Sequence, residues 1–104
     1  MTFREYSDEL RNYHFHPLDL STIYDYFSLS QTIGQISEKM KAMLESSESM
    51  SEIDKQKMAI SLGDIIMWAT FMIFDMGLNI DDTIELNLKK CLLMKKKLME
   101  QNNK

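Results

Sequence analysis

The chain has 104 residues, a formal net charge of −4 and a single cysteine. This length fits one small domain, residues 1–104, whose modest core would gain stability from association between copies. Interspersed acidic and basic residues argue against nucleic-acid binding through a broad basic face. One proline, three glycines and ten methionines favour an all-helical protein with an adaptable core. We expect a cytoplasmic protein, because a lone cysteine suits a reducing compartment and no signal peptide is visible.

The first predicted helix covers residues 3–13. Thr2 precedes it, and the glutamate three residues later completes the pattern of a capping box. Pro17 is expected to break the helical pattern, because proline lacks a backbone donor and restricts the residue before it. His14 and His16 lie between these features, and we interpret this His-x-His pair as part of a loop rather than as a metal site.

The second predicted helix covers residues 18–45, and the third covers residues 50–76. Polar residues 46–51 form the linker, where Ser49 and the glutamate three residues later match a second capping box. Apolar side chains at helical spacing along the second helix are expected to form its packed stripe. These are Leu20, Ile23, Phe27, Ile36, Met40 and Met43.

The third predicted helix contains an uncharged run over residues 65–74. This run is far shorter than the roughly 20 apolar residues that span a bilayer, so we expect no membrane association. A helix that is apolar on nearly all sides must be covered on nearly all sides. We therefore expect residues 65–77 to pack inside a helical bundle and also on a second subunit, in a homodimer or tetramer.

The fourth predicted helix begins at Asp81 or Asp82 and ends near Met99. Gly77 precedes it and suits the left-handed conformation that follows many helix ends. Cys91 falls in the apolar stripe of this helix, where we expect a buried side chain rather than a nucleophile. The residues expected on the inner side of the helix are Ile84, Leu88, Leu92 and Leu98.

Two of the three glycines, Gly34 and Gly63, lie inside predicted helices. A glycine there costs about 1 kcal/mol relative to alanine, which suggests that the helix backbones approach closely at both positions. Polar residues flank each glycine within otherwise apolar surroundings. If the helices cross near the glycines, these residues converge on one polar pocket, formed by Gln31, Thr32, Gln35, Ser61 and Asp64.

Several segments, in this order, resemble those of the MazG-like all-α nucleotide pyrophosphohydrolases. Residues 34–41 (GQISEKMK) look like the family's Gly-Glu-Val-Ala-Glu-Lys-hydrophobe-Lys segment, and residues 62–68 (LGDIIMW) look like its Leu-Gly-Asp-Val-Leu-Trp segment. Residues 2–6, 77–82 and 87–90 resemble its opening helix, its Gly-Ile-x-Leu-Glu-Glu turn and its Asn-Leu-x-Lys end. The resemblance covers most of the chain and implies a four-helix MazG-like bundle.

The family holds Mg²⁺ with the acidic motifs Glu-Glu-x-x-Glu and Glu-x-x-Asp, and the ion activates water to cleave between the α and β phosphates. Magnesium prefers anionic oxygen ligands, which explains the carboxylates. The corresponding residues here are Gln31, Thr32 and Gln35 in the first motif and Ser61 and Asp64 in the second. Only Asp64 is acidic, so the resemblance implies a pocket that keeps hydrogen-bonding groups and loses most of its catalytic charge.

Three functions follow as alternatives. The first is a MazG-like protein that binds a nucleotide or nucleotide-like ligand with little or no hydrolysis, in a sequestering or regulatory role. The second is a divergent pyrophosphohydrolase, in which Asp64 and Glu38 hold Mg²⁺ together with substrate phosphates. The third is a structural or protein-interaction helical dimer without a small ligand. The candidate ligand-binding residues are Gln31, Thr32, Gln35, Glu38, Ser61, Asp64, Trp68, Asn87 and Lys90.

Several of these residues also have ordinary structural explanations. Trp68 and Phe71 follow Asp64 by one and two helical turns, where they could stack on a base or belong to the core. Asn87 and Lys90 match the family's last helix, where the lysine can face phosphate, but the same positions suit a solvated helix face. The polar residues of the expected pocket could equally be remnants in a core that has lost its ligand.

Overall fold

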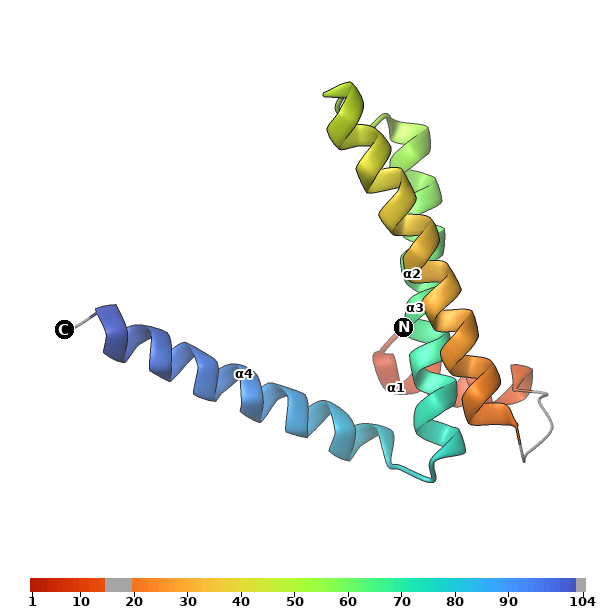
Figure 1. The fold of residues 1–104 in the computed structure, drawn as a ribbon. Helices are drawn as coiled ribbons and strands as arrows, with labels where there is room; N and C mark the ends of the chain where they lie inside the picture. The colour runs from red at the N-terminus through yellow and green to blue at the C-terminus, as the bar shows by residue number, and fades with distance from the viewer. Residues whose placement is uncertain (15–19, 103–104) are drawn as a thin grey trace.

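The computed structural model describes residues 1–14 and 20–102, and within these ranges the chain is helical and contains no strand. The described residues form four α-helices, arranged as in Figure 1, and this confirms the all-α prediction and the predicted number of helices. His16 and Pro17 lie outside the described residues. The helices are α1 (Phe3–Leu10), α2 (Ser21–Ser46), α3 (Glu52–Asp75) and α4 (Ile80–Asn102), and a short 3-10 turn, η1 (Arg11–Tyr13), follows α1.

Helices α2 and α3 form a long antiparallel hairpin, in which they lie side by side along their length (Figure 1). The link is short because Ser47 adopts a left-handed conformation (φ 58°) and its amide donates to the carbonyl of Met43. The cap of α3 is Ser51, whose hydroxyl accepts from the amide of Asp54 at 3.1 Å. The prediction of Ser49 as the cap is therefore wrong by two residues.

The packed face of α2 differs from the predicted stripe. Residues that are buried or half-buried recur every three or four positions, as expected for a helix packed on one side, at Ser21, Asp25, Ser28, Thr32 and Ile36. By contrast, Leu20, Ile23 and Phe27 are 55–64% exposed, so their assignment to the packed stripe is wrong. Polar side chains therefore occupy the buried positions along the first half of α2, while Leu20, Ile23 and Phe27 are exposed.

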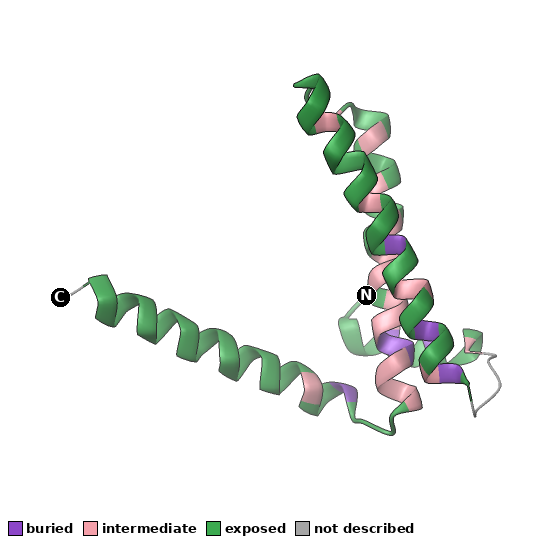
Figure 2. Ribbon diagram, viewed as in Figure 1, coloured by how far each residue is buried: buried purple, intermediate pink, exposed green. Residues whose placement is uncertain are grey.

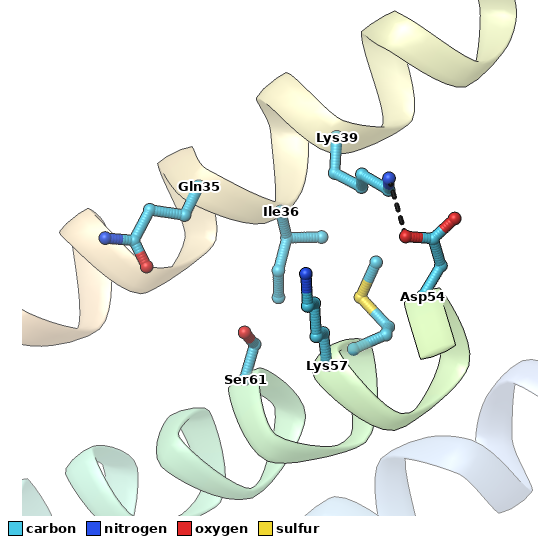
Figure 3. A pocket seen from close by; sticks show the side chains of 7 residues that line it. Gln35, Ile36, Lys39, Asp54, Lys57 and Ser61 are labelled. Atoms are coloured by element: carbon cyan, nitrogen blue, oxygen red, sulfur yellow. Dashed lines mark ion pairs between the residues drawn. The ribbon is translucent and has the colours of Figure 1, made fainter. Parts of the chain in front are cut away.

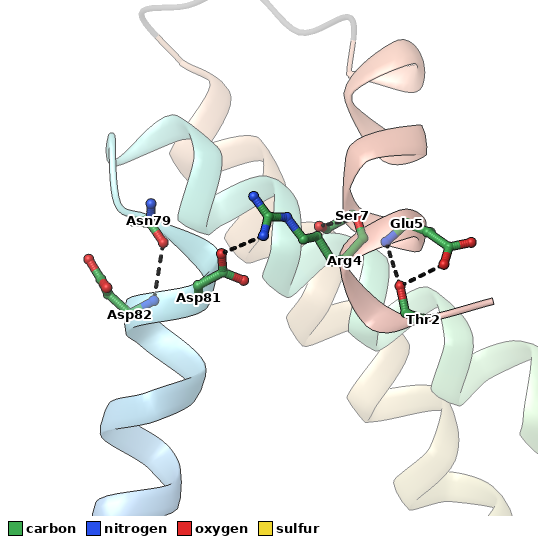
Figure 4. A network of polar contacts seen from close by, with 7 residues as sticks. All are labelled: Thr2, Arg4, Glu5, Ser7, Asn79, Asp81 and Asp82. Carbon is green, nitrogen blue, oxygen red and sulfur yellow. Dashed lines mark hydrogen bonds and ion pairs between the residues drawn. The ribbon is translucent and has the colours of Figure 1, made fainter.

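Helix α1 and η1 pack across the lower end of the hairpin in Figure 1, where Ser7 and Leu10 are buried. Thr2 caps α1 as predicted, since its hydroxyl accepts from the amide of Glu5 at 3.1 Å and donates to that side chain (Figure 4). The same view shows Arg4 and Asp81 facing each other, and Nη1 of Arg4 is 3.9 Å from Oδ2 of Asp81. The start of α1 therefore lies close to the start of α4.

Helix α4 projects away from the hairpin (Figure 1). Gly77 adopts the predicted left-handed conformation, with φ 69°, and Asn79 caps α4 by accepting from the amide of Asp82 at 3.1 Å. Beyond Ile80 and Thr83 the described part of α4 is exposed (Figure 2). The prediction of an inner side is wrong within this chain, because no described element covers it, and the exposed residues include Ile84, Leu88, Cys91, Leu92 and Leu98.

Helix α3 is long and apolar but mostly uncovered by the rest of the chain (Figure 2). Thr70 and Phe71 are its buried residues, most others near its end are half-buried, and Ile66 is 46% exposed. By length and composition α3 meets the requirement for crossing a membrane, although the central helices of soluble proteins often meet it too. Full burial of residues 65–77 thus does not occur within one chain.

Candidate functional site

A cavity of about 240 Å³ lies between the second half of α2 and the first half of α3. Figure 3 shows Ile36 of α2 and Lys57 of α3 pointing into the space between the helices, with Ser61 at one end and the ion pair of Lys39 and Asp54 at the other, while the Gln35 side chain points to the side along α2. The Lys39 Nζ and Asp54 Oδ1 atoms are 2.8 Å apart. The cavity is lined by Gln35, Ile36, Lys39, Asp54, Lys57, Met58 and Ser61.

The charges around this cavity favour an anion. Hydrogen bonds from Lys39 and then Ser51 hold the pKa of Asp54 below its usual value, so the Lys39–Asp54 pair stays ionised and internally neutral near pH 7. Lys57 adds a further positive charge from α3, and its side chain extends into the space in Figure 3. The amide of Gln35 and the hydroxyl of Ser61 offer neutral hydrogen-bonding groups beside it.

The structure brings only some of the predicted pocket residues to this cavity. Gln35 and Ser61 line it, whereas Gln31 and Glu38 are exposed and lie outside its lining. Thr32 is buried, and its hydroxyl donates to the carbonyl of Ser28 at 3.0 Å, which is an ordinary contact of a helical threonine.

Asp64 is half-buried on α3. Burial, and then the negative charge of Asp64, raise the pKa of the Tyr6 hydroxyl on α1. Ser61 is the last residue of α3 in the cavity lining, and Asp64, three residues further on, is not part of it. A second cavity, of about 370 Å³, opens between the start of α1 and Gly63 of α3.

The predicted close approach at Gly34 and Gly63 is wrong. A Cβ atom placed on either glycine would meet no described atom within 4 Å, apart from its own helix backbone and chain neighbours. Both glycines therefore cost helix stability without allowing a tighter helix crossing.

The aromatic residues of α3 pack against protein side chains. The ring of Trp68 lies edge-on to those of Tyr24 and Phe71, with centroid distances of 5.8 and 5.7 Å. Phe71 is 2% exposed, and its ring stacks on His14 at 4.8 Å. These contacts favour the core explanation for both residues.

The two candidate residues of the last helix are solvent-exposed. Asn87 accepts a long contact from the thiol of Cys91, with 3.9 Å between Oδ1 and Sγ, and Lys90 is exposed beside it. Because α4 leads away from the hairpin in Figure 1, one chain does not bring these residues to its own cavity between α2 and α3.

A buried polar cluster lies at the lower end of the hairpin, and we call it the base cluster: His14, Ser21, Asp25 and Asp75. The Nε2 atom of His14 is 2.9 Å from Oδ1 of Asp75, 3.8 Å from Oδ2 of Asp25 and 3.1 Å from the hydroxyl of Ser21. Ser21 also donates to Oδ2 of Asp75 at 2.6 Å. His14 does lie in the loop after η1, as predicted, but its side chain belongs to this polar cluster.

The two carboxyls of the base cluster have opposite pKa shifts. Burial, together with the hydrogen bond and charge of Asp75, raises the pKa of Asp25 to about 8, so its neutral form is favoured at pH 7. Burial also acts to raise the pKa of Asp75, but hydrogen bonds from Asp25 and Ser21 and the nearby His14 outweigh it and lower that pKa. Two close carboxyls that share one proton behave in this way.

Local sequence patterns carry little signal for the base cluster, because its members come from three separate segments. The available signal is the spacing of polar residues on α2, since Ser21, Asp25, Ser28 and Thr32 fall on one face. An acidic residue on such a face needs a partner, and the antiparallel hairpin places the end of α3 opposite it.

Comparisons of this chain with protein-family models, with curated proteins and with solved structures find no match.

Proposed function

We propose that this protein is a MazG-like helical bundle that binds a nucleotide or nucleotide-like ligand between α2 and α3 with little or no hydrolysis. It would then sequester the ligand or respond to it. The observation that carries this proposal is the cavity lined by Gln35, Ser61 and Lys57, in which the Lys57 side chain extends into the space between the two helices (Figure 3).

The chemistry of the cavity supports binding without a metal. Gln35 and Ser61 belong to the two segments that resemble the family's acidic motifs, and both are neutral here. With the Lys39–Asp54 pair neutral, Lys57 leaves the lining with a net positive charge. A phosphate can therefore accept hydrogen bonds directly from the protein, whereas a carboxylate cluster would require a bridging cation.

The size of the cavity supports partial enclosure of the ligand by one chain. Its volume of about 240 Å³ lies just below the range of roughly 300–1,000 Å³ for small-molecule sites. One chain can thus hold the phosphate or ribose part, and the remainder of the ligand would contact a second copy. The protein is accordingly proposed to act as a homodimer or tetramer in the cytoplasm.

The exposed apolar surface supports this assembly. A chain of this length gains much from burying apolar area against another copy, because its own core is small. Helix α3 exposes Ile60 and Ile66, and α4 exposes a nearly continuous series of large apolar side chains. The series consists of Leu86, Leu88, Leu92, Leu93, Met94, Leu98 and Met99.

The test is a calorimetric and thermal-shift titration with nucleoside mono-, di- and triphosphates, in EDTA and in Mg²⁺. Binding in EDTA without release of pyrophosphate is expected. Lys57→Gln should weaken binding by about 10-fold, the usual effect of losing one charged hydrogen bond. Lys41→Gln is the matched control, because it removes the same charge from α2 outside the cavity lining.

Two results would contradict the proposal. Binding that depends on Mg²⁺ and releases pyrophosphate would identify an active hydrolase and would bring Asp64 and Glu38 back as metal ligands. An absence of any nucleotide effect, with the same assembly in all variants, would identify a structural helical dimer.

A further inference from the structure

The base cluster has the composition of a metal site. It brings the imidazole of His14 within reach of the carboxyls of Asp25 and Asp75, and the candidate ligand atoms of these three residues all lie within 4.8 Å of one another. The residues come from three segments: the end of η1, the second turn of α2 and the last residue of α3. An ion bound here would join all three segments at one point.

The distances between the ligand atoms of the cluster suit coordination of one shared metal ion. Zinc binds imidazole nitrogen and carboxylate oxygen at about 2.0–2.2 Å, so two ligands of one ion lie about 3.0–3.4 Å apart for angles between octahedral and tetrahedral. The separations of 2.9 Å and 3.8 Å from Nε2 of His14 to the two carboxyls bracket these values. Small side-chain rotations would therefore complete the coordination.

The surroundings already hold the ligands in place. Ser21 donates to Oδ2 of Asp75, which directs Oδ1 of the same carboxyl toward His14. The Phe71 ring stacks on the His14 ring and restricts its orientation. Metal-binding carboxylates and imidazoles in proteins typically have such supporting contacts, and these contacts are part of what sets their affinity.

Burial and charge also point to a cation. The side chains of Asp25, Asp75 and His14 are 0%, 4% and 16% exposed. Two buried carboxylates require compensation by a proton or by a cation, because an isolated buried charge is costly. A divalent ion balances both carboxylates while His14 stays neutral, and neutral imidazole is the form that binds metals.

A serine-hydrolase arrangement does not fit the same residues. In such a triad the carboxylate holds Nδ1 of the histidine, while Nε2 faces the serine. Here the same Nε2 atom contacts Ser21 and Asp75, and Ser21 is 1% exposed, so a substrate cannot reach its hydroxyl.

We propose that His14, Asp25 and Asp75 bind one divalent transition-metal ion, with Zn²⁺ as the representative ion. Mixed nitrogen and oxygen ligation favours a first-row transition metal over Mg²⁺, which prefers oxygen ligands alone. The ion fastens η1 to the lower end of the hairpin. This site is separate from the cavity of the proposed nucleotide site, since the two share no residue.

The test uses the full chain, stripped of metal with EDTA and then dialysed free of chelator. Titration with Zn²⁺ by calorimetry should show one ion per chain, and Co²⁺ should give the visible absorption of a nitrogen- and oxygen-ligated ion. Asp25→Asn and Asp75→Asn should each weaken Zn²⁺ binding by more than about 100-fold, because each removes an anionic ligand. Asp8→Asn, the same change at an exposed residue of α1 outside the cluster, should leave the affinity unchanged.

Ser21→Ala tests the supporting contact. It keeps all three ligands and frees Asp75, so we expect a loss of Zn²⁺ affinity of about 10- to 100-fold with an unchanged stoichiometry. Far-UV circular dichroism checks that each variant remains helical.

The proposal is overturned if the wild-type chain takes up neither Zn²⁺ nor Co²⁺, a measurement that does not depend on any variant. It is equally overturned if one ion binds per chain and folded Asp25→Asn and Asp75→Asn proteins bind it as tightly as the wild type. Neither outcome bears on nucleotide binding, which is measured in EDTA.

Discussion

The lower end of the α2–α3 hairpin and helix α4 distribute their side chains in opposite ways. At the hairpin end, polar residues such as Asp25 and Ser21 are buried. On α4, large apolar residues such as Leu88 and Leu92 are more than half exposed. Hydropathy alone therefore does not decide burial in this chain. A residue is buried where another element lies opposite it, and buried polar groups are tolerated because they contact one another.

The largest expected effect is at the centre of the hairpin end. Phe71→Ala removes a ring that is 2% exposed and stacked on His14, and it should lower the free energy of unfolding by about 3–5 kcal/mol. Urea unfolding followed by circular dichroism measures this change. Phe27→Ala, at a residue 64% exposed, is the matched control. If Phe27→Ala lowered the free energy of unfolding as much as Phe71→Ala does, this result would show that a second copy covers this face of α2.

The next largest effect is expected for substitutions on the exposed apolar surface of α4. In the double variant Leu88→Glu/Leu92→Glu, two charges replace apolar side chains on one face, which should weaken self-association by about 2 kcal/mol or more. Light scattering at several concentrations should then show the 12.3 kDa monomer. Lys97→Glu, on the opposite face of α4, is the control and should keep the assembly. A wild-type chain that is already monomeric would refute the proposed dimer.

A smaller effect distinguishes the two serines that precede α3. Ser51 accepts from the amide of Asp54, so Ser51→Ala should cost about 1 kcal/mol, the usual value for a lost helix cap. Ser49→Ala should change the free energy of unfolding by no more than about 0.5 kcal/mol. Thermal or urea unfolding of the pair gives both values, and equal costs would contradict the observed start of α3.

The smallest effect concerns the two helical glycines. Gly34→Ala and Gly63→Ala introduce a methyl group into open space, so each should raise the free energy of unfolding by about 0.5–1 kcal/mol. Gly77→Ala is the contrasting variant, because its positive φ disfavours a side chain and the change should be destabilising. Destabilisation by Gly63→Ala would instead indicate that a second chain or a ligand packs against α3 at this point.

The candidate site likewise contains some residues that the sequence predicted and others that it did not. Gln35 and Ser61 could be paired from the sequence, because polar residues beside helical glycines in two neighbouring helices suggested a shared pocket. Lys57 and the Lys39–Asp54 pair were not foreseen, since their meeting depends on the register of α2 against α3. Asp64 was expected in the same pocket, but the structure leaves it outside the lining.

The sequence by itself determined the helical class, the four helices and most of their ends. Thr2 and Gly77 act through hydrogen bonds and backbone conformations within a few residues, so their effects can be predicted locally. The tertiary structure decided which faces are covered. Ser21 and Asp75 are 54 positions apart, and only the antiparallel hairpin brings them together with His14. The exposure of α4 has the same origin, because burial depends on what lies opposite a residue rather than on the residue alone.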